Sequence, residues 1–77
     1  LAMPENEINS IANNANMIIA GYAFTADDGV IRVLNLNNPG EACVLSLNGE
    51  LIESNMDEAT FALVQAYYLK NRGFMEG

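Results

Sequence analysis

Three clusters of turn-forming residues divide the middle of the chain at regular intervals. They are Asp27-Asp28-Gly29, Asn37-Asn38-Pro39-Gly40 and Asn48-Gly49. Glycine, asparagine and aspartate tolerate the positive φ angles of tight hairpin turns, and the proline stops a strand from continuing through the middle cluster. Because connections this short cannot cross over to a parallel neighbour, the segments between them must pair in the antiparallel sense.

These segments predict four strands, at residues 22–26, 30–36, 42–47 and 50–53. Side chains alternate between the two faces of a strand, and the second and third strands carry apolar residues on both faces. In the second strand Val30, Leu34 and Leu36 oppose Ile31 and Val33, and in the third Cys43, Leu45 and Leu47 oppose Ala42 and Val44. Both faces of the sheet therefore need cover.

A helix is predicted on each side of these strands. Residues 4–20 carry an amphipathic stripe, with Pro4 in the first turn and Gly21 as the terminator. The second helix begins at Ser54 or Asn55, because Asn55 and Glu58 have the spacing of a capping box, and it runs to about Asn71. The predicted inner stripes are Ile8, Ile11, Ala12, Ala15, Ile18 and Ile19 in the first helix, and Met56, Ala59, Thr60, Leu63, Val64 and Tyr67 in the second.

This order predicts one α+β domain over residues 1–77, in which a helix, a four-stranded antiparallel meander and a helix follow one another and the helices pack on the sheet. Two arrangements are open. The helices cover opposite faces, or both cover one face and a second subunit or another protein covers the other; we favour the second. Met3-Pro4 resembles a natural start, so two alternatives are open for residues 1–3: they are disordered, or Leu1-Ala2 derive from an expression vector.

The composition excludes most residue-level chemistry. The chain has no histidine, one cysteine and three basic residues against ten acidic ones, for a formal charge of −7. The commonest general base and metal ligand is therefore missing, and the charge opposes direct binding to nucleic acid. The single thiol agrees with a reducing, cytoplasmic compartment, and no segment resembles a signal peptide or a membrane span. We expect no catalytic residue, cofactor or metal site.

Four features are candidate sites, and each has a plainer structural interpretation. Asp27-Asp28-Gly29 is favoured as a hairpin turn over a calcium loop. The acids Glu50, Glu53, Asp57 and Glu58 suit a hairpin edge and a helix start, where acids are common. Cys43 is expected to be a small buried hydrophobe. Arg32 is expected to pair across strands with Glu41 or Glu53 rather than to bind an anionic ligand.

The size of the chain suggests self-association. A domain of this length buries a small core, and association stabilises a fold by mass action. We therefore predict a non-enzymatic, acidic interaction module that forms a homodimer, with Tyr68, Phe74 and Met75 as possible interface residues. A basic protein is a second possible partner. The alternative is a small-ligand binder or enzyme with a carboxylate or tyrosine site formed between subunits.

One resemblance covers most of the chain. The run from Gly21 to Leu34, together with Asn55-Met56-Asp57-Glu58 and the segment from Tyr67 to Arg72, is similar to small uncharacterised proteins of Gram-positive gut bacteria and their mobile elements. The resemblance implies a small α+β bacterial domain of unknown function. It assigns no active residue, so none is transferred to this chain.

Overall fold

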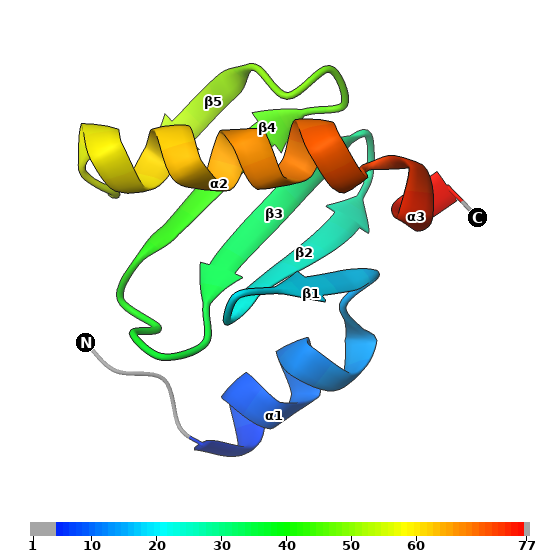
Figure 1. Ribbon diagram of the computed structural model, residues 1–77. Helices are drawn as coiled ribbons and strands as arrows, with labels where there is room; N and C mark the ends of the chain where they lie inside the picture. The colour runs from blue at the N-terminus through cyan, green and yellow to red at the C-terminus, as the bar shows by residue number, and fades with distance from the viewer. Residues whose placement is uncertain (1–4, 77) are drawn as a thin grey trace.

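The computed structural model of the protein describes residues 5–76, and its centre is a five-stranded antiparallel sheet (Figure 1). The sheet order β1-β2-β3-β4-β5 follows the chain, as in a meander. The strands are β1 (Met17–Ile19), β2 (Tyr22–Asp27), β3 (Val30–Asn35), β4 (Ala42–Ser46) and β5 (Leu51–Ser54), and the helices are α1 (Glu5–Asn14), α2 (Glu58–Asn71) and α3 (Gly73–Glu76). The predicted α+β class and antiparallel pairing are confirmed. The expectations for residues 1–3 lie outside the described residues.

The extra strand, β1, forms from the end of the segment predicted as the first helix. Helix α1 ends at Asn14, and Met17 and Ile19 pair with Phe24 and Tyr22 of β2. Gly21 does not end a helix: it follows Ala20 in the β1–β2 turn, where both residues have positive φ. The isoleucines fit a strand as well as a helix, and pairing with β2 satisfies their backbone groups while it buries Met17.

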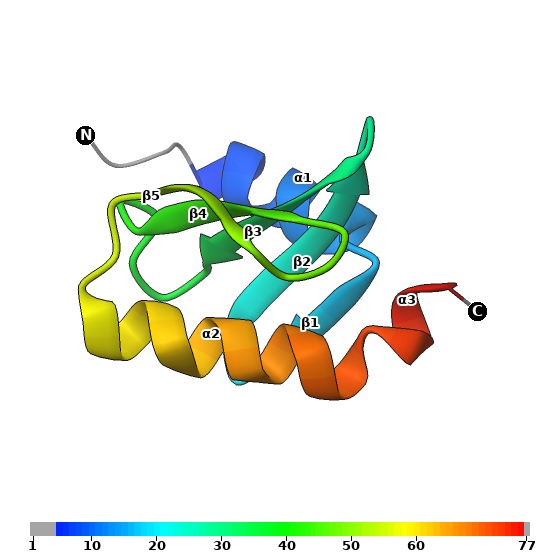
Figure 2. The ribbon, with the colours of Figure 1, turned by 90° about the horizontal axis from the view of Figure 1, so that it is seen from above.

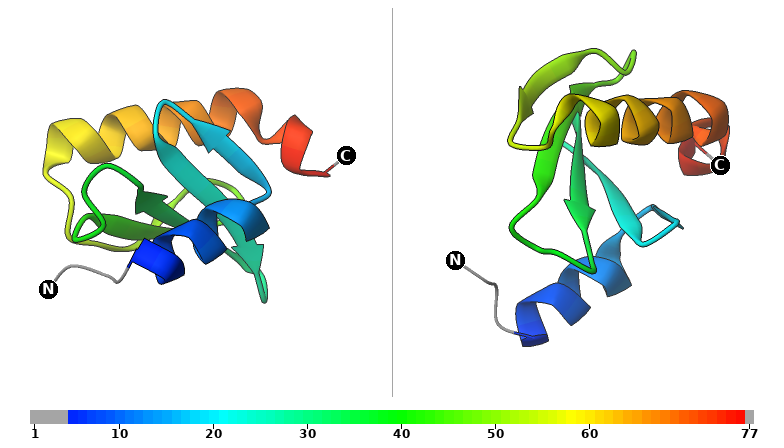
Figure 3. Two further views of the ribbon diagram at one scale, coloured as in Figure 1. Left: turned by 90° about the horizontal axis from the view of Figure 1, so that it is seen from below. Right: turned by 60° about the vertical axis from the view of Figure 1, so that its left-hand side comes forward.

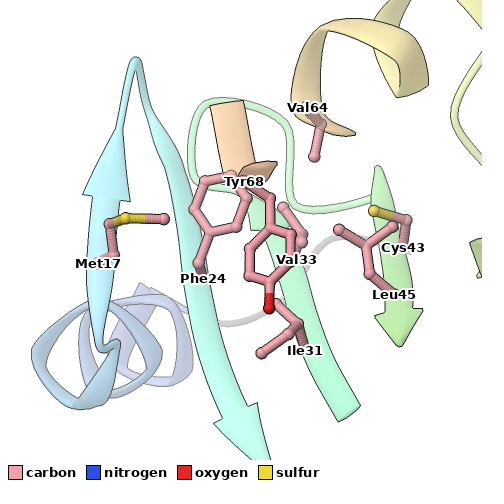
Figure 4. Close-up of a cluster of buried hydrophobic side chains, with 8 residues drawn as sticks. All are labelled: Met17, Phe24, Ile31, Val33, Cys43, Leu45, Val64 and Tyr68. Atoms are coloured by element: carbon pink, nitrogen blue, oxygen red, sulfur yellow. The ribbon is translucent and has the colours of Figure 1, made fainter. Parts of the chain in front are cut away.

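The main core lies between the sheet and α2 (Figure 4). Phe24, Ile31, Val33 and similar side chains of four strands meet Val64 and Tyr68 of the helix. The Phe24 and Tyr68 rings stack with their centroids 6.4 Å apart and their planes 18° apart. The strand residues that contribute are Met17, Phe24, Ile31, Val33, Cys43 and Leu45, all less than one tenth exposed.

The buried side of α2 differs from the predicted stripe. Val64 and Tyr68 are buried, whereas Leu63, which was expected inside, is 46% exposed. Apolar residues surround this helix on every side, so their spacing alone does not select the buried face. Two polar contacts orient the helix instead. The Tyr68 hydroxyl donates to the Leu47 carbonyl at 2.7 Å, and the Gln65 side-chain amide donates to the Gly49 carbonyl at 2.8 Å.

Helix α2 is capped by Asp57 and not by Ser54 or Asn55. The Asp57 carboxylate accepts a hydrogen bond from the Thr60 backbone N–H at 2.6 Å, and the hydrogen bonds from Thr60 lower the pKa of this carboxyl below its ordinary value of 3.8. Asn55 joins the chain to β4: its side chain accepts from the Ala42 N–H and donates to the Gly40 carbonyl. The predicted capping box is therefore wrong.

Helices α1 and α2 lie on opposite faces of the sheet (Figures 2 and 3). The favoured arrangement, with both helices on one face, is wrong. The face under α1 carries two cross-strand rows, Ile18-Ala23-Leu34-Ala42 and Thr25-Arg32-Val44-Glu53. Helix α1 contacts β2, and Ala23 and Leu34 are buried beside it. Since α2 already occupies the opposite face, α1 buries this second set of apolar residues.

Candidate functional site

The acidic residues singled out in the sequence are spread over three elements. Glu50 lies in the β4–β5 turn, Glu53 on β5, and Asp57 and Glu58 at the start of α2; all four are exposed. Asp28 and Gly29 form the β2–β3 turn with positive φ at both positions, so the hairpin interpretation of this segment is confirmed. Over residues 5–76 no three histidine, cysteine or acidic side chains come close enough to hold a metal ion.

Cys43 is buried in the core, as predicted. Its side chain is 3% exposed, and burial raises the pKa of the thiol from 9.0 to about 11. The charged thiolate is disfavoured because the apolar surroundings cannot solvate it. The thiol therefore stays protonated at neutral pH and lacks the reactivity of a nucleophilic cysteine.

We expect iodoacetamide to alkylate Cys43 about 100-fold more slowly in the native protein at pH 8 than in urea, because only the thiolate reacts and the pKa is higher by about two units in the fold. The rate can be followed by mass spectrometry. Equal rates in the two conditions would place the sulfur at the surface and contradict the structure.

Arg32 pairs with a residue that the sequence analysis did not name. Its Nε–H donates to the Asp27 carboxylate at 2.8 Å, and both side chains are more than half exposed. The predicted partners, Glu41 and Glu53, do not make this contact: the Glu41 carboxylate accepts from the Asn35 side chain. Asp27 lies diagonally across the β2–β3 ladder from Arg32, on the same face, which explains the choice. An exposed pair of this kind contributes little to stability.

The three proposed interface residues occupy different environments. Tyr68 is 4% exposed and belongs to the core of its own chain, so it offers no free surface and its assignment to an interface is corrected. Met75 is partly buried against the same core. Phe74, on α3, is 76% exposed. The sequence could not separate Tyr67 from Tyr68, because either side of an apolar helix could face the sheet.

The outward side of α2 is exposed and lacks charge. From Ala59 to Leu69 the helix contains no charged residue, although half of it faces solvent. We call the exposed residues of this side the outer face of α2; they are Ala59, Ala62, Leu63, Ala66 and Leu69. Leu63 and Leu69 are 46% and 49% exposed. Glu58 precedes this face and Lys70 follows it, so the two ends carry charges of opposite sign.

Hydrogen bonds join the β4–β5 turn to the C-terminal half of α2. The Leu47 carbonyl accepts from the Tyr68 hydroxyl and from the Arg72 guanidinium, while the Gly49 carbonyl accepts from Gln65. Gly49 is buried with a φ of +88°. The side chains of Leu47, Leu51 and Ile52 beside this turn are more than half exposed. The polar contacts fix the turn while its leucines face outward.

A cavity of about 350 Å³ lies between α1 and the sheet. Its lining combines apolar side chains with three polar ones, and the residues are Ile11, Asn14, Ala23, Thr25, Arg32, Val33, Leu34 and Ala42. The sequence analysis missed this cavity because it depends on where α1 crosses the sheet. The position of α1 depends in turn on β1, which was not predicted.

The comparisons with known proteins identify a family. A family of unknown function (DUF7723) matches residues 5–75, which is nearly the whole chain. The chain belongs to this family. Comparison with curated proteins and with solved structures finds no match. Over the described residues no helix has the length and apolar character that a membrane crossing needs. The DUF7723 assignment carries no activity and no functional residue.

Proposed function

We propose that this member of DUF7723 is a non-enzymatic, acidic interaction module of the bacterial cytoplasm that forms a two-fold dimer through the outer face of α2. The uncharged outer face carries the proposal. A helix at a protein surface ordinarily presents charged and polar residues to water, and a helix that is apolar all round is ordinarily buried. Ala59, Leu63 and Leu69 face water in the single chain.

A second copy fits this face better than an unrelated partner because the ends of the helix carry opposite charges. In an antiparallel pair the acidic first turn of one α2, with Glu58, lies near the basic last turn of the other, with Lys70. The helix dipoles also oppose one another in this orientation. The small side chains of Ala62 and Ala66 let two helices approach closely. A two-fold axis makes the same patch serve both copies.

The proposed dimer leaves other charges free for a further partner. Glu50 and Glu53 lie outside the outer face of α2 and are exposed on either side of Leu51 and Ile52. These carboxylates suit a basic protein, which is the second class of partner that we propose for the module. Electrostatic association of this kind weakens as the salt concentration rises.

Ala62→Glu tests the dimer. We expect light scattering to give twice the mass of the chain at high concentration and half of that on dilution, and we expect the variant to stay monomeric at every concentration. Two glutamates would meet in the centre of the interface, where desolvated like charges cost several kcal/mol. The monomer fold should be unaffected, because residue 62 faces solvent.

Asn13→Glu is the matched control, because it adds the same charge to an exposed position of α1. This variant should dimerise as the unmodified protein does. The proposal is refuted if the unmodified protein is a monomer at every concentration. It is also refuted if both variants form dimers with the same dependence on concentration.

A further inference from the structure

The cavity between α1 and the sheet is a second feature of the fold, separate from the outer face of α2. We propose that it binds a small molecule with an apolar body and one anionic head group, which lies beside Arg32. Its volume of about 350 Å³ falls within the range of small-molecule sites, about 300–1,000 Å³. Given that a water molecule takes about 30 Å³, the cavity holds about a dozen non-hydrogen atoms.

The walls of the cavity suit an apolar body. Ile11 of α1 faces the sheet residues Ala23, Leu34 and Ala42, which form one cross-strand row. Two of the three sheet residues are alanines, whose small side chains leave open the space that a larger side chain would fill. Ala23 and Leu34 are buried and form the floor of this part of the lining, while Ile11 and Ala42 are partly exposed. On the helix side, Asn14 is the polar member of the lining.

The other two polar side chains of the lining lie in the neighbouring cross-strand row. Thr25 and Arg32 are direct cross-strand partners on β2 and β3, and both line the cavity. Arg32 donates to Asp27 through Nε alone, and among the described residues its other guanidinium N–H groups have no protein partner. Those groups match a carboxylate or similar anion in geometry and charge. The head group therefore lies at the Arg32 end and the apolar body under α1.

The charge of the site limits the head group to a single negative charge. Asp27 already shares the Arg32 guanidinium, and the chain as a whole carries a formal charge of −7. A polyanion such as a nucleotide would meet one partly neutralised cation and a repulsive surface. An alkyl carboxylate meets a matched cation and loses apolar surface to the cavity, which favours it over both a polyanion and a neutral alcohol.

Decanoate and decanol are suitable probes because they share one chain length and differ in charge. We expect decanoate to shift the backbone amide signals of Ala23, Thr25, Arg32, Leu34 and Ala42 in two-dimensional NMR spectra, saturably and below its micelle-forming concentration. Decanol should bind the same residues about fivefold to tenfold more weakly, since it cannot form a charge-assisted hydrogen bond.

Two variants separate the head-group contact from the cavity. Arg32→Gln should weaken decanoate binding about fivefold to tenfold and leave decanol binding unchanged. Ala42→Leu fills the cavity and should weaken both. Arg72→Gln, which removes the same charge from a residue that donates to the Leu47 carbonyl beside α2, is the control and should change neither.

The inference fails if decanoate causes no saturable shift, if the shifts lie on α2, or if Arg32→Gln affects both probes equally. None of these results bears on the dimer, because α1 and α2 lie on opposite faces of the sheet (Figure 2) and the cavity lies on the α1 side. The Arg32–Asp27 pair is exposed, so its loss should leave the fold intact. A change in decanoate binding by Arg32→Gln can then be assigned to the lost guanidinium.

Discussion

Phe24→Ala should lower the free energy of unfolding by about 3–5 kcal/mol. The Phe24 side chain is fully buried at the centre of the core, where its ring stacks on Tyr68 and packs among side chains from the neighbouring strands (Figure 4). Alanine removes the buried apolar surface of the ring and leaves a cavity that the surrounding strands cannot close, because their backbone hydrogen bonds hold them in register.

The effect is large relative to the whole stability of a chain of this size. At about 0.05–0.15 kcal/mol per residue, 77 residues correspond to about 4–12 kcal/mol. Urea denaturation followed by circular dichroism measures the change, and a variant that is largely unfolded without urea agrees with the upper part of the range. Phe74→Ala is the control: its ring is 76% exposed, so the change should stay within about 0.5 kcal/mol. Similar losses for both variants would contradict this core.

Gly49→Ala should lower the free energy of unfolding by about 2–4 kcal/mol, from two separate causes. Gly49 has a φ of +88°, which side-chain-bearing residues rarely adopt. A Cβ atom at this position would also lie 2.6 Å from Leu69 Cδ2 and 3.2 Å from Leu69 Cγ. The β4–β5 turn cannot retreat easily, because α2 holds the carbonyl groups of Leu47 and Gly49.

Gly29→Ala isolates the backbone cause. Gly29 has a φ of +84°, close to that of Gly49, but a Cβ atom there would meet nothing within 4 Å. This control should lose only the cost of the backbone conformation, about 1–2 kcal/mol. Leu69→Ala combined with Gly49→Ala should recover the remainder, and a double-mutant cycle in urea measures it. If the two glycine substitutions cost the same, the close approach of α2 to the turn would be refuted.

Much of the sheet could be predicted because its signals are local. The turn residues at 27–29 and 48–49 predicted the antiparallel β2–β3 and β4–β5 hairpins, and the alternation of apolar residues predicted the two faces of β3 and β4. The existence of α2 and the burial of Cys43 were also predicted. Each depends on a few neighbouring residues, whose conformational preferences act whatever the rest of the chain does.

The errors share one cause. The isoleucines at 18 and 19 fit a helix or a strand, and only pairing with β2 decides for the strand. Asp57 caps the helix, because the Asn55 side chain is already hydrogen-bonded to the β3–β4 connection and to β4. Arg32 likewise pairs with Asp27, which the diagonal geometry of the ladder brings beside it. In each case a contact with a neighbouring strand or connection selected among conformations or partners that the local sequence allows.

The candidate sites were also predicted only in part from the sequence. The absence of charge between Glu58 and Lys70 is visible in the sequence, but the predicted stripe placed Leu63 inside. The cavity beside Arg32 has no sequence signal, because Ile11 and Ala42 belong to segments that meet only in the folded chain.

By itself, the sequence determined that the middle of this chain is an antiparallel meander and that histidine chemistry is absent, since turns and composition are properties of short segments or of the whole set of residues. Tertiary structure alone decided which side of α2 is buried, that β1 is a strand, and that the two long helices lie on opposite faces of the sheet. These choices depend on packing and hydrogen bonds between separate segments of the folded chain, where several local conformations have similar free energies and the final contacts select one.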